Sequence, residues 1–285
     1  MTSHQTLGAR AGSIGTATVD ELVAMAESKN LHLQRVTWVH HWTEGLFSFR
    51  IERPPSFRFR SGEFVMIGLT DGDRPLMRAY SIASPSWEDH LEFFSVKVPN
   101  GPLTSRLQHL EPGNLIFLGR KPTGTLVLDA LLPGRRLFMV GTGTGLAPFL
   151  SVLRDPDTHE KFEQIIITHT VREEQELAYR NFLEEEIRND EIFGEMLRDR
   201  FVYYPTVTRG EFKTPGRITD RIREGAFAED LGLIGNRFQP DASRVMVCGS
   251  MAFNKDMAAM LDEHGMVEGS NAAPGSYVLE RAFVG

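Results

Sequence analysis

The chain has 285 residues, which suits two domains better than one small core, and its 41% hydrophobic and 24% charged residues exclude a disordered or fibrous protein. The net charge of −7 argues against nucleic-acid binding through a basic surface, and no apolar run approaches the roughly 20 residues that cross a bilayer. The charge is uneven, because residues 1–134 are neutral and residues 135–285 carry the whole of it.

The N-terminal 30 residues predict a tail followed by a short helix. Residues 1–17 are small, polar and aperiodic, which is typical of a mobile terminus. Thr18 and Glu21 have the spacing of a capping box ahead of an apolar run, so we expect a helix to begin there. We assign residues 1–30 to neither of the two domains.

From residue 31 to about 130 the pattern changes to short β-branched and aromatic runs separated by Pro, Gly and Asp, which is typical of strands. The runs are LHLQRVTWV, LFSFRIE, EFVMIGL, RAYSIAS, LEFFSVKV, LIFLG and GTLVL. Many short strands joined by turns predict an antiparallel barrel over residues 31–130.

The run RAYSIAS places a cation, an aromatic ring and a hydroxyl within four residues. Arg78 and Tyr80 share one face of a strand, and Ala79 and Ser81 share the other. A planar cofactor that carries a phosphate can stack on Tyr80 and pair with Arg78. The alternative is an ordinary strand with alternating burial.

A second candidate for phosphate binding follows in the same half of the chain. The segment Phe94–Pro99 leads into the sequence Gly-Pro-Leu-Thr-Ser at 101–105, where a short helix begins. The hydroxyls and amides of Thr104 and Ser105 open this helix, and such a helix start can hold a phosphate.

After residue 134 apolar strands alternate with longer helical stretches. We expect strands at 136–143, 164–171, 201–208, 244–250 and 276–283, and helices near 146–154, 174–188, 217–225 and 251–264. This alternation predicts a mostly parallel, doubly wound sheet with helices on both faces over residues 131–285, and a domain boundary near 130.

The sequence Gly-Thr-Gly-Thr-Gly at 141–145 follows one predicted strand and precedes a helix. Backbone amides at such a strand-to-helix turn can face a pyrophosphate. The turn can also be only a tight connection. Its spacing matches neither the dehydrogenase Gly-x-Gly-x-x-Gly nor a P-loop, which ends in Lys-Ser/Thr.

Arginines follow the ends of the next strands. Arg172 ends the strand 164–171, Thr208 and Arg209 end the strand 201–208, and Arg217 comes eight residues later. An Arg at these positions neutralises the 2′-phosphate of NADP, whereas a carboxylate would select NAD. Each Arg alone can also be a solvated surface charge, paired for example with Glu173 or Glu174.

Cys248 is the only cysteine, which excludes an intramolecular disulfide and an iron–sulfur cluster held by four thiolates. A single cysteine fits a reducing, cytoplasmic compartment. Cys248 lies at the end of a predicted strand, where it is either a small buried hydrophobe or a compact side chain beside a reacting ring. The nine His residues show no metal-ligand spacing, so we expect no metal.

Five motifs occurring in one order resemble the bacterial ferredoxin (flavodoxin)–NADP reductases from about residue 35 to the end. They are Arg78-Ala79-Tyr80-Ser81, Gly101-Pro102-Leu103-Thr104-Ser105, Gly141-Thr142-Gly143-Thr144-Gly145, Val247-Cys248-Gly249-Ser250 and Glu280-Arg281-Ala282-Phe283-Val284-Gly285. The resemblance implies an FAD-binding six-stranded antiparallel barrel followed by an NADP-binding parallel sheet. It also implies an enzyme that exchanges electrons between NADP(H) and ferredoxin or flavodoxin.

The resemblance implies roles for individual residues. The residues implied for FAD are Arg78, Ala79, Tyr80, Ser81, Phe94, Ser95, Val96, Lys97, Pro102, Leu103, Thr104 and Ser105; those for NADP are Thr142, Gly143, Arg172, Thr208, Arg209 and Arg217. Ser81, Cys248 and Glu280 are the implied catalytic residues, with Ser81 at flavin N5 and Glu280 in proton handling.

The C-terminus departs from the plant-type members, which end in a Tyr that stacks on the flavin. The matching position is Ala282, followed by Phe283, Val284 and Gly285. In the bacterial subclass such an extension is similar to a strap over the FAD, so we expect Ala282 and Phe283 to cover the cofactor.

An alternative function is a stand-alone NADPH:flavin or quinone reductase that needs no protein carrier. An electron-transfer subunit with its own cluster is excluded by the single cysteine. We expect a cytoplasmic monomer whose partner is ferredoxin or flavodoxin, and which binds neither nucleic acid nor membrane.

Overall fold

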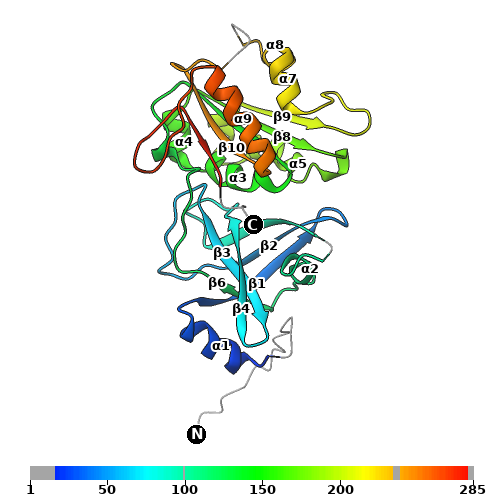
Figure 1. The fold of residues 1–285 in the computed structure, drawn as a ribbon, viewed down its shortest axis with the longest axis vertical. Coiled ribbons are helices and arrows are strands. Elements are labelled where there is room, and N and C mark those ends of the chain that lie inside the picture. Colours follow the sequence, from blue (N-terminus) through cyan, green and yellow to red (C-terminus); the bar gives the residue numbers. More distant parts are fainter. Residues whose placement is uncertain (1–16, 99, 234–237, 282–285) are drawn as a thin grey trace. The chain divides into compact units, whose positions relative to one another are not determined.

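The computed structural model describes residues 17–98, 100–233 and 238–281, and the chain divides into two compact units (Figure 1). Within the described residues, unit 1 comprises 17–57, Val65–Tyr80 and Asp89–Pro122; unit 2 comprises Arg58–Phe64, Ser81–Glu88 and the chain from Thr123 onward. Two short segments before residue 120 therefore group with unit 2. The single boundary near residue 130 stays a prediction.

The first helix, α1 (Val19–Ser28), begins where the capping box predicts it. The Thr18 hydroxyl accepts a hydrogen bond from the Glu21 backbone N–H at 3.3 Å, and the Glu21 carboxylate accepts one from the Thr18 N–H at 2.7 Å. Leu22 and Ala26 are buried against Phe117, which fixes the helix on the sheet of unit 1.

The antiparallel sheet of unit 1 has six strands in the order β4-β3-β6-β1-β2-β5. They are β1 (His32–His41), β2 (Leu46–Glu52), β3 (Phe64–Asp71), β4 (Arg74–Ser81), β5 (His90–Val96) and β6 (Leu115–Leu118). Phe47, Phe49 and Ile51 of β2 are fully buried, and Leu46 and Ser48 beside them are buried as well, so β2 lies inside unit 1. The short helix α2 (Thr104–Leu107) lies between β5 and β6 in the chain.

The two outermost strands of this sheet approach each other. The hydroxyl of Tyr80 on β4 lies 3.3 Å from the hydroxyl of Ser95 on β5, and the Tyr80 ring packs edge-on against Phe93 with 6.4 Å between centroids. The sheet therefore curls into the barrel that the strand pattern predicts.

One predicted strand is wrong. Residues 124–128 (GTLVL) form no ladder, since only an isolated bridge between Phe64 and Thr123 precedes them and the 3₁₀ turn η1 (Leu128–Ala130) follows. Leu126 and Val127 are buried nonetheless. Their apolar character reflects burial of a connection, which composition alone does not distinguish from a strand.

The sheet of unit 2 is parallel throughout, in the order β11-β10-β7-β8-β9. Its strands are β7 (Arg136–Thr142), β8 (Gln164–Val171), β9 (Phe201–Val207), β10 (Ser243–Cys248) and β11 (Tyr277–Leu279). They are almost continuously buried, as expected of a parallel sheet covered on both faces, which confirms the predicted fold class.

Helices and turns of unit 2 follow the strands. They are the helices α3 (Ala147–Leu153), α4 (Pro156–Lys161), α5 (Arg180–Glu184), α6 (Gly194–Leu197), α7 (Ile218–Glu224), α8 (Ala226–Asp230) and α9 (Met251–Glu263), and the 3₁₀ turns η2 (Gly143–Leu146), η3 (Glu174–Glu176) and η4 (Glu186–Asn189). Met257 and Leu261 of α9 join the core of this unit with Val245 and Val247, and α9 crosses the sheet beside β10 (Figure 1).

The predicted single helix at 174–188 is wrong, because this segment forms η3, α5 and the start of η4. Tyr179 adopts a left-handed conformation, with φ of 60°, which interrupts the helix before α5. The Glu176 carboxylate also accepts hydrogen bonds from the backbone N–H groups of Arg172 and Glu173, which closes a separate turn.

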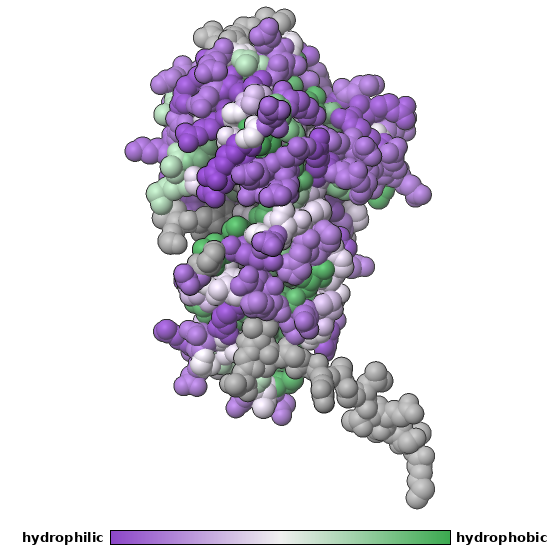
Figure 2. Space-filling view, turned by 90° about the vertical axis from the view of Figure 1, so that its right-hand side faces the viewer, coloured by the Kyte–Doolittle hydropathy of each residue, from purple (hydrophilic) through white to green (hydrophobic). Residues whose placement is uncertain are grey.

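Hydrophilic residues cover most of the visible face of unit 2 in Figure 2. In the part of the chain that the structure describes, no helix has both the length and the apolar character needed to span a bilayer.

Candidate functional site

The strand order of unit 2 places a switch point between β7 and β10. From β7 the chain proceeds outward through β8 and β9, and then returns to the other side of β7 to form β10 and β11. Ligands of open parallel sheets bind outside the carboxyl ends of the strands at such a point. Gly141 of β7 pairs with Cys248 of β10, so the glycine turn and the lone cysteine lie side by side at this edge.

The glycine turn is η2, and it packs closely on the end of β10. A Cβ atom at Gly145 would collide with the carbonyl oxygen of Cys248, so only glycine permits this approach. Gly143 has φ of 52°, and a Cβ there would meet no atom within 4 Å. The turn is therefore both a tight connection and an open backbone surface at the edge of the sheet.

Cys248 and Glu280 lie in adjacent strand ends and interact electrostatically. Cys248 is fully buried, and burial together with the negative charge of Glu280 raises the pKa of its thiol well above the ordinary value. The thiol is therefore protonated at neutral pH and is no thiolate nucleophile. The Glu280 backbone is fixed by its N–H, which donates to Val247 O, and by its carbonyl, which accepts from Asn254 Nδ2 at 2.7 Å.

The arginines predicted at the strand ends lie together. The N–H of Arg209 donates to the carbonyl of Arg172 at 2.8 Å, and the N–H of Thr208 donates to Val171 O at 3.0 Å. Arg172, Arg209 and Arg217 are all exposed. Within the described ranges no acidic side chain forms an ion pair with any of these three arginines.

The alternative that Arg172 pairs with Glu173 or Glu174 is wrong. Glu174 pairs with Arg180 at 2.7 Å, and the Glu173 side chain caps its own turn. The surface at the ends of β8 and β9 thus retains unneutralised positive charge, as a phosphate site requires.

A cluster that the sequence did not indicate holds the loop between Arg209 and Arg217. The Tyr204 hydroxyl donates to Asp230 at 2.5 Å and accepts from Arg221 Nε at 2.7 Å, while Arg221 pairs with Asp230 at 2.6 Å. Arg221 also donates to the carbonyl of Pro215 within the loop. Burial chiefly raises the pKa of Tyr204 to about 12, so the phenol stays neutral.

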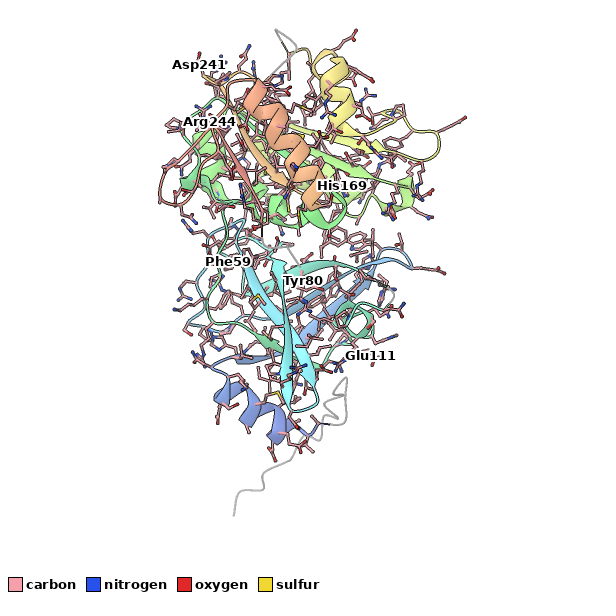
Figure 3. The ribbon with its side chains drawn as sticks, viewed as in Figure 1. Phe59, Tyr80, Glu111, His169, Asp241 and Arg244 are labelled. Carbon is pink, nitrogen blue, oxygen red and sulfur yellow. The ribbon has the colours of Figure 1, made fainter. Side chains whose placement is uncertain are left out.

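His169 is a second residue of this region that no sequence motif indicates. It is fully buried in β8, with Nε2 3.1 Å from the carbonyl of Gly143 and Nδ1 3.1 Å from the hydroxyl of Tyr203 (Figure 3). Burial lowers the pKa of its imidazole to about 4. No sequence motif distinguishes this histidine from the other eight, since its partners come from two other segments.

In unit 1 the structure places the predicted cation and aromatic ring on one face of β4. Arg78 is exposed, and its Nη1 donates to the carbonyl of its neighbour Met77 at 2.8 Å. Tyr80 is half-buried and hydrogen-bonds Ser95 (Figure 3). Burial raises the pKa of the Tyr80 phenol, so it presents a neutral ring. These two residues fit a stacked ring and a phosphate.

The next residue, Ser81, carries an orphaned polar atom. Its side chain is 5% exposed, and its Oγ has no hydrogen-bond partner among the described residues. A buried hydroxyl without a partner costs free energy unless a ligand atom completes its hydrogen bonding. Ser81 therefore fits the flavin N5 role that the resemblance implies.

The second FAD segment combines buried and exposed residues. Phe94, Ser95 and Leu103 are buried, whereas Val96 and Val98 are 40% and 44% exposed. Exposed valines that flank a lysine, Lys97, form an apolar surface that a cofactor can cover.

Two hydrogen bonds to backbone carbonyls hold the start of α2. The Ser105 N–H donates to Gly101 O at 3.1 Å, and the Thr104 hydroxyl donates to Val98 O at 3.4 Å. Pro102 lies exposed in the turn before α2, and Ala79 is half-buried in β4. The expected cofactor strap at Ala282 and Phe283 lies outside the described residues.

Comparisons with known proteins cover both halves of the chain. The model of the oxidoreductase FAD-binding domain family matches residues 31–127, and that of the oxidoreductase NAD-binding domain family matches residues 139–259. A flavodoxin/ferredoxin–NADP reductase from Rhodobacter capsulatus is 52% identical over 94% of this chain and 99% of its own. A ferredoxin–NADP reductase from Azotobacter vinelandii is also 52% identical, over 90% of this chain and 98% of its own.

Among solved structures, a ferredoxin NADP⁺ reductase from Neisseria gonorrhoeae with bound FAD and NADP superimposes with a TM-score of 0.80. It is 29% identical and covers 89% of this chain and 99% of its own. These similarities extend over almost the whole described chain.

Proposed function

The chain belongs to the family of the flavodoxin/ferredoxin–NADP reductases, and on this premise we propose how its residues serve that activity. It is an FAD-dependent oxidoreductase that exchanges electrons between NADP(H) and a one-electron carrier, ferredoxin or flavodoxin. The observation that carries the assignment of its NADP site is the unneutralised Arg172 and Arg209 at the strand ends of a sheet whose glycine turn lies at the switch point.

NADP(H) binds along the carboxyl edge of the parallel sheet. We assign Thr142 and Gly143 to the nicotinamide half, since the glycine turn offers open backbone beside Cys248. We assign the 2′-phosphate to Thr208, Arg172, Arg209 and Arg217, because a guanidinium binds a phosphate dianion through charge-assisted hydrogen bonds.

We assign residues 31–130 to FAD binding. Tyr80 stacks on the ring, and Arg78 neutralises the pyrophosphate. The other FAD residues are Ala79, Ser81, Phe94, Ser95, Val96, Lys97, Pro102, Leu103, Thr104, Ser105 and, in the C-terminal strap, Ala282 and Phe283. When bound, FAD accepts a pair of electrons as hydride and releases them singly, which joins a two-electron donor to a one-electron carrier.

Three residues are assigned to the reaction itself. The Ser81 hydroxyl donates a hydrogen bond to flavin N5, for which its buried and unpartnered Oγ is suited. The Cys248 thiol, neutral because it is buried, packs beside the nicotinamide without reacting with it. Glu280 handles the proton that accompanies the electrons, and the Asn254 side chain holds its backbone.

We propose that the protein works as a monomer in the cytoplasm. Its single cysteine suits a reducing compartment, and it needs a separate carrier because it cannot bind a four-thiolate cluster.

The experiment that tests this assignment is an anaerobic titration of the purified, FAD-loaded protein with NADPH and, separately, with NADH. We expect NADPH to reach the half-maximal rate of flavin bleaching at a concentration at least tenfold lower than NADH does, because only NADPH carries the 2′-phosphate that the arginines bind. Equal titration by both dinucleotides would refute the phosphate assignment, and a protein that cannot be loaded with FAD would refute the function.

A further inference from the structure

His169 connects two strands to the glycine turn through its side chain. Its Nε2 contacts the carbonyl oxygen of Gly143 in η2, and its Nδ1 contacts the hydroxyl of Tyr203 on the neighbouring strand β9. The imidazole is fully buried, so no water competes for either nitrogen. The two contacts therefore account for both of its polar atoms.

The direction of each hydrogen bond follows from chemistry. A carbonyl oxygen only accepts, so Nε2 of His169 carries the proton and donates to Gly143. Because its pKa is lowered to about 4, the ring is neutral near pH 7 and Nδ1 is an acceptor. The Tyr203 hydroxyl is then the donor to Nδ1, and burial keeps it protonated by raising its pKa. Gly143 and Tyr203 together thus fix the tautomer of His169.

This hydrogen bond fixes the orientation of one peptide group in the glycine turn. Peptide bonds of the described chain are trans, so the carbonyl of Gly143 and the N–H of Thr144 point in opposite directions. With the carbonyl held toward the buried imidazole, the N–H of Thr144 points away from that imidazole. Gly143 itself, in its left-handed conformation, borders open space. The turn therefore places this donor on the side opposite the imidazole, at the start of η2.

We propose that His169 is a positioning residue for NADP(H), which holds the Gly143 carbonyl inward so that the Thr144 N–H faces the dinucleotide. This inference rests on the proposed NADP site at the glycine turn. Without the His169 donor, the peptide after Gly143 is free to rotate, since glycine permits both orientations. The bound orientation must then be selected on binding, and the affinity for NADP(H) falls.

The test compares two variants of the FAD-loaded protein. Gln places its amide nitrogen near the position of Nε2, whereas Asn reaches only the position of Nδ1. His169→Gln therefore keeps a donor for Gly143, and His169→Asn loses it while still accepting from Tyr203. We expect His169→Asn to weaken NADP⁺ binding about tenfold, the equivalent of about 1.4 kcal/mol for one lost hydrogen bond, and His169→Gln to restore most of it.

The measurement is isothermal titration calorimetry with NADP⁺ and with 2′-phospho-AMP. The second ligand carries the 2′-phosphate but no nicotinamide half, so its affinity should stay within about twofold in both variants. A matched control is His159→Asn, because His159 is another buried histidine whose Nε2 contacts a backbone carbonyl, that of Leu153. We expect it to leave both affinities unchanged.

Three results would overturn the inference: unchanged NADP⁺ affinity in His169→Asn, equal losses for both ligands, or no recovery in His169→Gln. If His169→Asn does not fold, Tyr203→Phe takes its place, since it removes one of the two hydrogen bonds that hold the imidazole in this orientation. Tyr203→Phe must then weaken NADP⁺ binding selectively. A wild-type protein that binds neither ligand would instead refute the proposed function, so the two failures are distinguishable.

Discussion

The residues of the candidate NADP site differ in charge and in exposure to solvent. Arg172 and Arg209 stay charged and exposed, whereas Cys248 and His169 are neutral because they are buried. Burial penalises the charged form of each group, which raises the pKa of the thiol and lowers that of the imidazole. The sheet edge therefore combines neutral groups at the glycine turn with positive charge at the ends of the outer strands.

The buried imidazole of His169 makes folding dependent on pH. Its folded pKa of about 4 lies below the ordinary value of 6.5, so the unfolded state binds the proton more readily. The free energy of unfolding therefore falls as the pH drops from about 6.5 toward 4. Between pH 7.5 and pH 5 we expect the wild type to lose about 2 kcal/mol more than His169→Gln.

Urea unfolding of the two proteins at both pH values measures this difference. The other histidines with lowered pKa values, His32, His41 and His159, are common to both proteins and cancel in the comparison. Equal losses in the two proteins would show that His169 is not held neutral in the folded state.

Candidate site residues could be predicted from the sequence where they belong to a local pattern. Arg172 and Arg209 follow predicted strands directly, and Ser81 lies in a four-residue motif. His169, Tyr204 and Arg221 had no such pattern, because their partners are 6 to 34 residues away and meet them only in the folded protein. Their roles depend on contacts that strand order creates.

At the scale of elements, the loop between β9 and α7 carries two of the arginines that we assign to the 2′-phosphate, Arg209 and Arg217. The far end of this loop returns to the end of β9, where the Val207 N–H donates to Thr214 O and the Gly216 N–H donates to Val207 O. The Tyr204, Arg221 and Asp230 cluster adds a contact to Pro215. Arg209 and Arg217 therefore extend from a loop with fixed ends, which reduces the entropy lost on binding.

Removing one of these arginines should change specificity and leave the chemistry intact. We expect Arg209→Ala to raise the KM for NADPH about 10- to 100-fold, the usual weight of a charge-assisted bond to phosphate, with kcat nearly unchanged. The KM for NADH, which lacks the 2′-phosphate, should not change.

Steady-state kinetics with ferricyanide as acceptor measures both constants. Lys213→Ala is the matched control, because Lys213 is an exposed cation of the same loop that pairs with Glu184 at 3.4 Å. A similar rise in KM for both dinucleotides in Arg209→Ala, or for NADPH in Lys213→Ala, would contradict the assignment of Arg209.

The helices and strands were largely predictable from the periodicity of apolar residues and from the Gly and Pro residues between them. The strands β7 to β10 and the helix α9 fall close to their predicted ranges, since apolar runs bounded by Gly and Pro are a strong signal, whereas β11 is much shorter than the predicted 276–283. The predicted strand at 124–128 and the predicted helix at 174–188 were wrong for different reasons. The first is a buried connection without a ladder, and the second contains Tyr179 in a left-handed conformation that a helical pattern does not reveal.

At the scale of the molecule, one chain carries two sheets of different construction. The antiparallel sheet of unit 1 carries the proposed FAD residues of β4 and β5, and the parallel sheet of unit 2 carries those for NADP(H). The excess negative charge lies in residues 135–285, and residues 1–134 are neutral. An acidic carrier protein therefore meets less repulsion on the N-terminal half of the chain.

In this family the electrons of NADPH pass to a protein carrier and not merely to a small acceptor. The decisive measurement is the NADPH-driven reduction rate of purified ferredoxin or flavodoxin as the carrier concentration is varied. We predict a rate that rises and saturates with one of these carriers. Saturable reduction of free flavin or quinone, with no reduction of either carrier, would contradict the account and favour the stand-alone reductase.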